Sequence, residues 1–587
     1  MAATTTPVPT GRDGPGLRAA VNARRRGAPV LSLLALVVGA AAALPLTYLV
    51  IRSSEIGLGR SLEIATSERA LNLLVDTTLL AVAVTGFSIL LAVPLAWLTV
   101  RTDLPGRRTW VVLTALPLTI PTYVGGYAFI AAIGPRGFAQ GWLEPLGVDE
   151  IPSIYGFWGA CLVLTLFSYP YVLLTTRAAM RRIDPSLEEA SRMLGRGRLE
   201  TFIRVVLPQL RPSITAGGLL VALYTLSDFG AVSLLRFDSF TRVIFVQYRA
   251  SLDRSTAAVY GLMLVVLTLA VLAVVQRTRG REQIHRLHAG GSRTANVVSL
   301  GRWRWPAFAA CSFLVLIALV IPLAVIVYWL QRGIDAGEPL RLTTDLVVNS
   351  LWASLLGALF AVIAAWPVAA LSVRHPGRLS RLVEGMSWSG YALPGVVVAL
   401  SLVFFGARVA TPFYQTMALL TFAYVVLFLP QAIGAIRSSM LQVTPSVEEA
   451  SRLLGASPFM TFRRIVLPLT RPGVSAGGAL VFLTAMKELP ATLLLAPTGY
   501  DTLSTQVYNA TVEAFFARAA APALALVALS ALPMAFIVAR EGREAGGATR
   551  SRTSPSAASA AEGEGAGPAQ PPRVKATVGA ADGVTAT

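Results

Sequence analysis

The sequence predicts an all-α polytopic membrane protein with about twelve transmembrane helices, arranged as two homologous halves of six. Its composition points to the bilayer. Of 587 residues, 54% are apolar and only 14% are charged, whereas soluble domains carry about 25% charged residues. Long apolar runs recur along the chain, each near the roughly 20 residues that cross a hydrocarbon core. A polar, arginine-rich segment also occurs twice, 260 positions apart.

The apolar runs set the order of the predicted elements. The first repeat covers residues 30–276, and a basic linker at 277–304 joins it to a second repeat at 305–540. Residues 1–29 and 541–587 hold few large apolar residues, so we expect disordered cytoplasmic ends. The first six spans are expected near 30–51, 72–100, 109–133, 154–176, 212–235 and 256–276. The second six are expected near 306–330, 347–373, 385–408, 414–436, 473–496 and 519–539.

The distribution of arginine predicts the orientation. With the N-terminus inside, the densest arginine clusters fall in cytoplasmic loops, as the positive-inside rule requires, and both termini are then cytoplasmic. These loops also explain the net charge of +19, so nucleic acid is not expected as a partner. Residues 24–51 could instead form a signal peptide. Their apolar stretch of about 20 residues is longer than the usual 7–15 of such segments, which favours a retained helix.

The repeated segment is the most specific feature of the chain. Residues 185–218 match residues 445–478 without a gap and are identical at 20 of 34 positions. Fainter matches lie upstream at an offset of 273: Pro94 with Pro367, Arg101 with Arg374, and Pro121 with Pro394. The two halves therefore derive from one membrane unit, which implies a pseudo-twofold arrangement around a central pathway.

Each copy predicts a helix–turn–helix outside the lipid. Asp184 and Thr444 are good N-caps, each followed by a proline suited to the first helical position, although Ser186 with Glu189 also has capping-box spacing. A glycine then predicts a left-handed C-cap. A second short helix follows, and we expect Pro208 and its counterpart Pro468 to interrupt it before the next span. An amphipathic helix resting on the bilayer surface is the alternative, but near-identity of the copies favours two docking elements for a partner with two equivalent sites.

These segments resemble the EAA loop of the permeases of binding-protein-dependent ABC importers. That pattern is EAA, then a glycine four residues after the last alanine, then LP about a dozen residues on. It is matched at Glu189, Ala190, Gly195, Leu207 and Pro208, and at Glu449, Ala450, Gly455, Leu467 and Pro468. The second alanine is replaced by Ser191 and Ser451, a small-for-small change.

The resemblance implies a type I importer fold with two cytoplasmic coupling helices, in loops at 184–208 and 444–468. It implies two copies of an ATPase subunit that bind ATP and magnesium, an extracytoplasmic substrate-binding protein, and a location in the bacterial inner membrane. No cofactor and no catalytic residue are expected in this chain, which has no GxxxxGK[ST] phosphate loop. The residues expected to dock the ATPases are Glu188, Glu189, Ala190, Gly195, Glu448, Glu449, Ala450 and Gly455.

Two further stretches are similar to the fused ferric-iron importer permeases. They are LSDFGAVSLLRFDSFTR at 226–242 and MKELPATLLLAPTGYDTL at 486–503. This similarity implies ferric iron, bare or chelated, as the cargo. Thiamine or another small solute is the rival cargo within the same class. A secondary transporter and a membrane scaffold are the competing classes, and the doubled docking loop disfavours both.

The same stretches place charges inside predicted spans. Asp228 aligns with Glu488 at the offset of 260, and Lys487 precedes Glu488. Because charges in a bilayer cost free energy, such residues usually face a cavity or a partner. We therefore expect either a pathway role or a structural ion pair of Asp228 with Lys487. Tyr123, Tyr127, Tyr169 and Tyr171 could be iron phenolates but are better explained as interfacial or packing residues, so no metal site is predicted.

Overall fold

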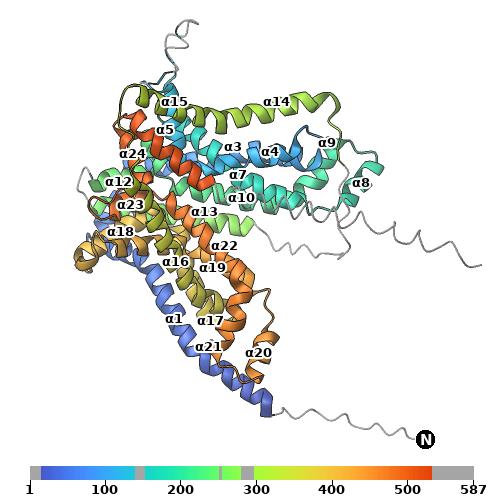
Figure 1. The fold of residues 1–587 in the computed structure, drawn as a ribbon, viewed down its shortest axis with the longest axis vertical. Helices are drawn as coiled ribbons and strands as arrows, with labels where there is room; N and C mark the ends of the chain where they lie inside the picture. Colours follow the sequence, from blue (N-terminus) through green and yellow to red (C-terminus); the bar gives the residue numbers. More distant parts are fainter. Residues whose placement is uncertain are drawn as a thin grey trace, which may run out of the picture. The chain divides into compact units, whose positions relative to one another are not determined.

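The computed structural model describes residues 15–135, 137–138, 140, 144, 152–249, 254–278 and 297–531. Its helices belong to one compact unit that includes both halves (Figure 1). Most of the predicted linker and the predicted C-terminal tail lie outside the described residues. The first helix begins at Pro15, inside the segment predicted to be disordered, because LRAAVNARRR is rich in good helix formers.

Over the described residues, the regular secondary structure of the first half is helical apart from an isolated β-bridge between Thr102 and Val298. Its helices are α1 (Pro15–Ser54), α2 (Leu58–Ala65), α3 (Glu68–Arg101), α4 (Arg107–Leu113), η1 (Leu116–Thr119), α5 (Thr122–Ile133), α7 (Phe157–Met180), α8 (Pro185–Met193), α9 (Arg198–Thr201), the π-helical turn η3 (Phe202–Val206), α10 (Leu207–Ser227), α11 (Gly230–Leu234), α12 (Phe240–Arg249) and α13 (Arg254–Thr278).

The second half repeats this order. Its helices are η4 (Gly301–Trp303), α14 (Arg304–Val315), the π-helical turn η5 (Leu316–Val320), α15 (Ile321–Asp335), α16 (Thr344–Arg374), α17 (Arg378–Ala392), α18 (Gly395–Arg408), η6 (Thr411–Phe413), α19 (Met417–Met440), α20 (Pro445–Leu453), α21 (Pro458–Thr461), the π-helical turn η7 (Phe462–Val466), α22 (Leu467–Met486), α23 (Pro490–Leu495) and α24 (Leu503–Val512). A further apolar helix spans Phe516–Ala531.

The third predicted span of each half is bent rather than straight. Within the described residues nine helices are long and apolar enough to cross a membrane, or up to eleven if each bent pair is one span. The bends are 92° between the segment Arg107–Thr119, which contains α4 and η1, and α5, and 99° between α17 and α18. Each falls at a matched proline, Pro121 or Pro394, which has no N–H to continue the preceding helix and holds the residue before it extended.

The fifth spans differ from the prediction at both ends. Pro208 and Pro468 do not interrupt the helix, which runs on from Leu199 to Ser227 in the first half and from Pro458 to Met486 in the second. A π-helical turn, η3 or η7, precedes each proline. A wider turn of this kind accommodates a residue that cannot donate its N–H. The spans then end at Ser227 and Met486 instead of continuing to 235 and 496.

The core of each half is a group of helices packed side by side. Helices α3, α7 and α10 pack together in the first half, and α16, α19 and α22 in the second (Figure 1). Small residues allow the close approach that membrane helices use in place of a hydrophobic driving force. A Cβ added at Gly217 of α10 would lie 2.7 Å from the Cα of Val172 of α7.

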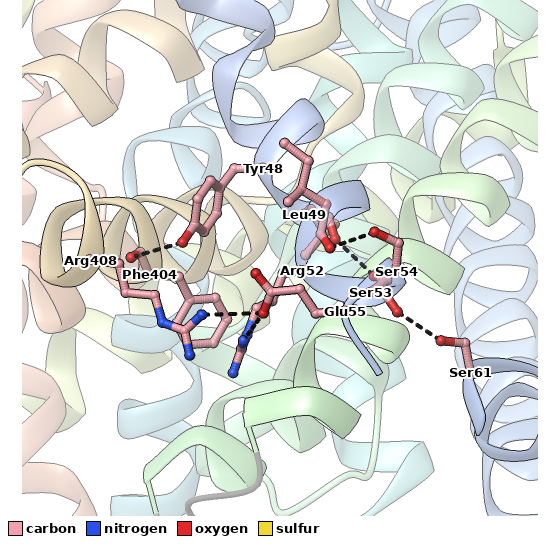
Figure 2. A network of polar contacts seen from close by, with 10 residues as sticks. Tyr48, Leu49, Arg52, Ser53, Ser54, Glu55, Ser61, Phe404 and Arg408 are labelled. Atoms are coloured by element: carbon pink, nitrogen blue, oxygen red, sulfur yellow. Dashed lines mark hydrogen bonds and ion pairs between the residues drawn. The ribbon is translucent and has the colours of Figure 1, made fainter. Parts of the chain in front are cut away.

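The first helix of each half packs against the other half. Helix α1 contacts α16, α17 and α18. At its end the Tyr48 hydroxyl donates to the carbonyl of Phe404, and Glu55 pairs with Arg408 at 3.2 Å (Figure 2). Helix α15 contacts α5, and the Trp329 indole donates to the carbonyl of Ala131 at 3.1 Å. The halves are therefore interlocked.

Candidate functional site

The helices predicted to dock the ATPases, α8 and α20, begin at the predicted prolines, but of the two predicted N-caps only Asp184 makes a capping side-chain hydrogen bond, and Thr444 makes none. The Asp184 carboxylate caps α8 by accepting from the backbone N–H of Ser186 at 2.9 Å, which places the cap at Asp184 and not two residues later. The glycines that end these helices, Gly195 and Gly455, have φ of 81° and 84°. Residues with a Cβ rarely adopt that conformation, so the turn requires glycine.

Large apolar side chains are exposed on both loops. Met193 and Leu194 are 89% and 79% exposed, and Leu453 and Leu454 are 79% and 88% exposed. They adjoin the exposed positions 189–190 and 449–450. Repeated exposed apolar surface of this kind is typical of an interaction site, because it is otherwise unfavourable in water.

The paired glutamates of each loop have different environments. Glu189 and Glu449 are exposed, but Glu188 turns inward and pairs with Arg101 at 3.0 Å. Glu448 pairs with Arg374 at 2.6 Å. Sequence reasoning placed all the glutamates in one docking set and missed both arginine partners. The match of Arg101 with Arg374 at the offset of 273 was the available signal.

The departure from the EAA pattern has a structural consequence. Ser191 and Thr201 join their hydroxyls at 3.1 Å across the first loop. Ser451 and Thr461 do the same at 3.0 Å across the second. All four side chains are buried. The serines that replace alanine therefore connect α8 to α9 and α20 to α21, across the turn that separates each pair.

A cavity of about 510 Å³ lies between the two halves, and its wall includes Asp228, Lys487 and Glu488. The structure thus brings Asp228 of the first half to the same cavity as the adjacent pair Lys487 and Glu488 of the second half. We predicted that these charges lie inside straight spans. They lie instead in the breaks between α10 and α11 and between α22 and α23. Each break leaves backbone N–H groups free at the start of the next short helix, and a carboxylate can accept from them.

The two carboxylates are held differently. Asp228 accepts from the backbone N–H groups of Ala231 at 3.0 Å and Val232 at 3.4 Å, and from the Thr122 hydroxyl. Glu488 accepts from the N–H of Ala491 at 3.3 Å. No other donor to Glu488 occurs among the described residues, so one of its oxygens keeps its hydrogen-bonding capacity.

The matched positions around these carboxylates explain the difference. Gly395 stands in the second half where Thr122 stands in the first, at the offset of 273. A Cβ at Gly395 would lie 2.6 Å from Glu488 Oε1. The glycine therefore leaves room for the longer glutamate, whereas the threonine supplies a donor to the shorter aspartate.

Lys487 joins the two halves without an ion pair to Asp228. Its ammonium donates to the carbonyl of Leu118 at 3.1 Å. Among the described residues no ion pair links Lys487 to Asp228, so the structural pairing that we considered is not formed in this structure. Asp228 instead satisfies its carboxylate within its own half.

Two segments, residues 86–281 and 357–543, match the model of a protein family described as the binding-protein-dependent transport system inner membrane component. Together they cover more than half of the chain. The chain belongs to this family. It is therefore the permease subunit of a binding-protein-dependent ABC importer, an inner-membrane protein that is not itself catalytic. Its family implies an ATPase partner, where ATP is hydrolysed, and a binding protein.

Several relatives of this permease are named for their cargo. The chain is 35% identical over 508 residues to the Fe(3+)-transport system permease protein FbpB 2 of Haemophilus influenzae, covering 86% of this chain and 97% of that protein. It is 26% identical over 424 residues to the ferric transport system permease protein FbpB of Actinobacillus pleuropneumoniae, covering 68% of this chain and 61% of that protein. It is 30% identical over 189 residues to the sulfate transport system permease protein CysT of Escherichia coli, covering 32% of this chain and 67% of that protein.

The four tyrosines considered above as iron phenolates divide into two pairs. Tyr127 donates to the carbonyl of Phe516 at 2.8 Å and Tyr169 to the carbonyl of Thr114 at 2.7 Å, and both side chains are buried. These two act in packing. Tyr123 and Tyr171 contribute to the cavity wall. In the described part of the chain, no three His, Cys, Asp or Glu side chains gather closely enough to hold a metal ion.

Proposed function

We propose that this permease imports ferric iron, bare or as a small chelate, which an extracytoplasmic binding protein delivers. The supporting observation is the similarity to FbpB 2, because it spans both halves and nearly the whole length of that relative. The similarity to CysT covers about a third of this chain, so it supports a common architecture rather than a common cargo.

In this proposal two ATPase subunits dock on α8 and α20 at the cytoplasmic face. Closure of the ATPases on ATP moves the two coupling helices together, and the cavity between the halves opens alternately to the two sides of the membrane. The exposed apolar side chains and the left-handed glycine turns of both loops support this docking. The orientation follows from the arginine-rich loops, with both termini in the cytoplasm.

The cavity suits a cargo that passes through without tight binding. Ferric iron is held firmly by several converging hard oxygen ligands. The cavity wall offers one carboxylate that is fully hydrogen-bonded, one with spare capacity, and one ammonium. A conduit gains nothing from strong retention, and iron that carries its own water or chelating oxygens needs few ligands from the wall.

Competitive uptake tests the cargo. The permease, its ATPase and its binding protein are reconstituted in liposomes, and ATP-dependent uptake of radiolabelled ferric iron is measured with excess unlabelled ferric citrate, thiamine or sulfate. We expect only the ferric competitor to reduce the signal. Uptake of labelled thiamine or sulfate in place of iron would contradict the proposed cargo while leaving the ABC importer intact.

A further inference from the structure

We propose that the long helices α3 and α16, here called the rods, transmit movement of the coupling helices α8 and α20 to the wall of the cavity. Arg101 and Arg374 make the connection at one end, and Thr77 and Ser350 make it at the other. This inference rests on the proposed docking of ATPases at α8 and α20. It concerns how that docking is converted into opening of the cavity.

At the coupling end, one guanidinium joins three elements. Arg101, the last residue of α3, is 3% exposed and pairs with Glu188 of α8. It also donates to the carbonyls of Met180 and Ile183, both 3.2 Å away, at the end of α7. Because a buried charge is costly to leave unpaired, these partners stay together when any of them moves.

The second half repeats this junction. Arg374, the last residue of α16, pairs with Glu448 of α20 and donates to the carbonyl of Val443 at 3.0 Å. Both side chains of the pair are largely buried, at 13% and 14% exposure. The chain itself connects α20 to α19 only through a short turn. The arginine therefore supplies a direct side-chain link from the coupling helix to α16.

At the other end, each rod accepts a backbone N–H through a buried hydroxyl. Thr77 of α3 accepts from the N–H of Phe240, the first residue of α12, at 3.1 Å. Ser350 of α16 accepts from the N–H of Leu503, the first residue of α24, at 2.8 Å. Thr77 and Ser350 are 273 positions apart, the same offset as Arg101 and Arg374. The contacts at both ends of α3 therefore recur at the matching positions of α16.

From there a second hydroxyl reaches the cavity wall. Thr241, next to Phe240, donates to the carbonyl of Asp228 at 2.6 Å. Ser504, next to Leu503, donates to the carbonyl of Met486 at 2.9 Å, directly before Lys487. Each half thus contains an unbroken series of contacts from the coupling helix, along the rod, to the segment that holds the cavity charges.

The rods connect two sites that lie far apart. Twenty-four residues separate Thr77 from Arg101, which is about 36 Å of α-helix at 1.5 Å per residue. Both rods run through a proline, Pro94 or Pro367, at the same position. Each helix nevertheless runs unbroken from Glu68 to Arg101 and from Thr344 to Arg374, so we expect it to move as one body and to carry a shift of α8 as far as Asp228.

Loss of coupling at constant docking tests the proposal. The full complex is reconstituted with Thr77→Val/Ser350→Ala or with Arg101→Gln/Arg374→Gln. Three quantities are measured: co-purification of the ATPase, stimulation of ATP hydrolysis by the loaded binding protein, and cargo uptake per ATP hydrolysed. We expect the ATPase to remain bound. Uptake per ATP and stimulation by the binding protein should both fall about tenfold, because both depend on the same series of contacts and a coupling free energy between two sites is typically worth about 5–150-fold.

Matched variants separate coupling from stability. Thr78 adjoins Thr77, but its hydroxyl donates within its own helix, to Leu74, so Thr78→Val should behave as wild type. Arg101→Lys/Arg374→Lys keeps the charge and should restore part of the coupling. If the glutamine variant fails to fold, the hydroxyl variant decides. Wild-type uptake per ATP and stimulation in Thr77→Val/Ser350→Ala, or an equal loss in Thr78→Val, would overturn the rod proposal. Absence of iron uptake by a stimulated wild-type complex would instead overturn the cargo, and loss of the ATPase in wild type would overturn the docking.

Discussion

The close approach of Gly395 to Glu488 gives a quantitative prediction. A Cβ at Gly395 would lie 2.6 Å from Glu488 Oε1 and 3.1 Å from Pro490 Cγ. In Gly395→Ala the flexible carboxylate must therefore move away from the new methyl group. Its hydrogen bond from the Ala491 N–H is already 3.3 Å long and will break. A hydrogen bond to a charged group is worth about 1.5 kcal/mol at the low end of measured values, which corresponds to roughly a tenfold loss in an equilibrium.

We expect the Gly395→Ala permease to fold and to bind its ATPase. Because the equilibrium then disfavours the position of Glu488 in the cavity wall by about tenfold, we expect uptake to slow by about the same factor. Gly434→Ala is the control, because no atom lies within 4 Å of the Cβ it would add. The initial rate of ATP-dependent uptake in liposomes is the assay. In a Glu488→Ala background the same methyl has no carboxylate to displace, so the two changes should not add. An additive loss in the double variant would refute the proposed cause.

Three further predictions follow from the loops and the cavity. Leu194→Glu/Leu454→Glu should abolish co-purification of the ATPase with little change in thermal stability, since both side chains are exposed; retention of the ATPase would contradict docking at these loops. Glu488→Gln should change the rate of uptake more than the melting temperature, whereas Asp228→Asn should lower the melting temperature more, because Asp228 holds its carboxylate in three bonds; the reverse order would show that the roles are exchanged. The hydrogen bond from the backbone N–H of Leu300 holds the pKa of Asp103 below its ordinary value of 3.8. The stability that this bond contributes is present above that pH and is lost as the pH falls through the lowered pKa. A melting temperature that falls equally in wild type and Asp103→Asn over that range would contradict this.

The sequence predicted the order of the helices and loops better than it predicted where the spans bend. The spans, the duplicated loops and the left-handed turns at Gly195 and Gly455 follow from local rules, because apolar length, proline and glycine act within a few residues. The bends at Pro121 and Pro394 were not predicted, although the two prolines were matched. A proline can sit inside a span, as Pro94 does in α3, and only the surrounding packing decides between a bend and a continuous helix.

The functional contacts depend on information that one sequence does not carry. Arg101 matches Arg374 at one offset and Glu188 matches Glu448 at another, so neither match indicates that the arginine and the glutamate meet. Asp228 and Glu488 were found as intramembrane charges. Their unequal surroundings depend on Thr122 and Gly395, which lie next to them on other helices. The hydropathy of the sequence does not indicate that either position contacts a carboxylate.

The most direct test of the account is ATP-dependent accumulation of radiolabelled ferric iron by the reconstituted complex, in wild type and in Gly195→Asp/Gly455→Asp. Both glycines have a positive φ that a side chain strains by about 1–2 kcal/mol, and the added charge adjoins the exposed apolar side chains of the loops. We predict uptake that requires ATP in wild type, and loss of both uptake and bound ATPase in the double variant. Uptake that persists without ATP, or that survives in the double variant, would contradict the account.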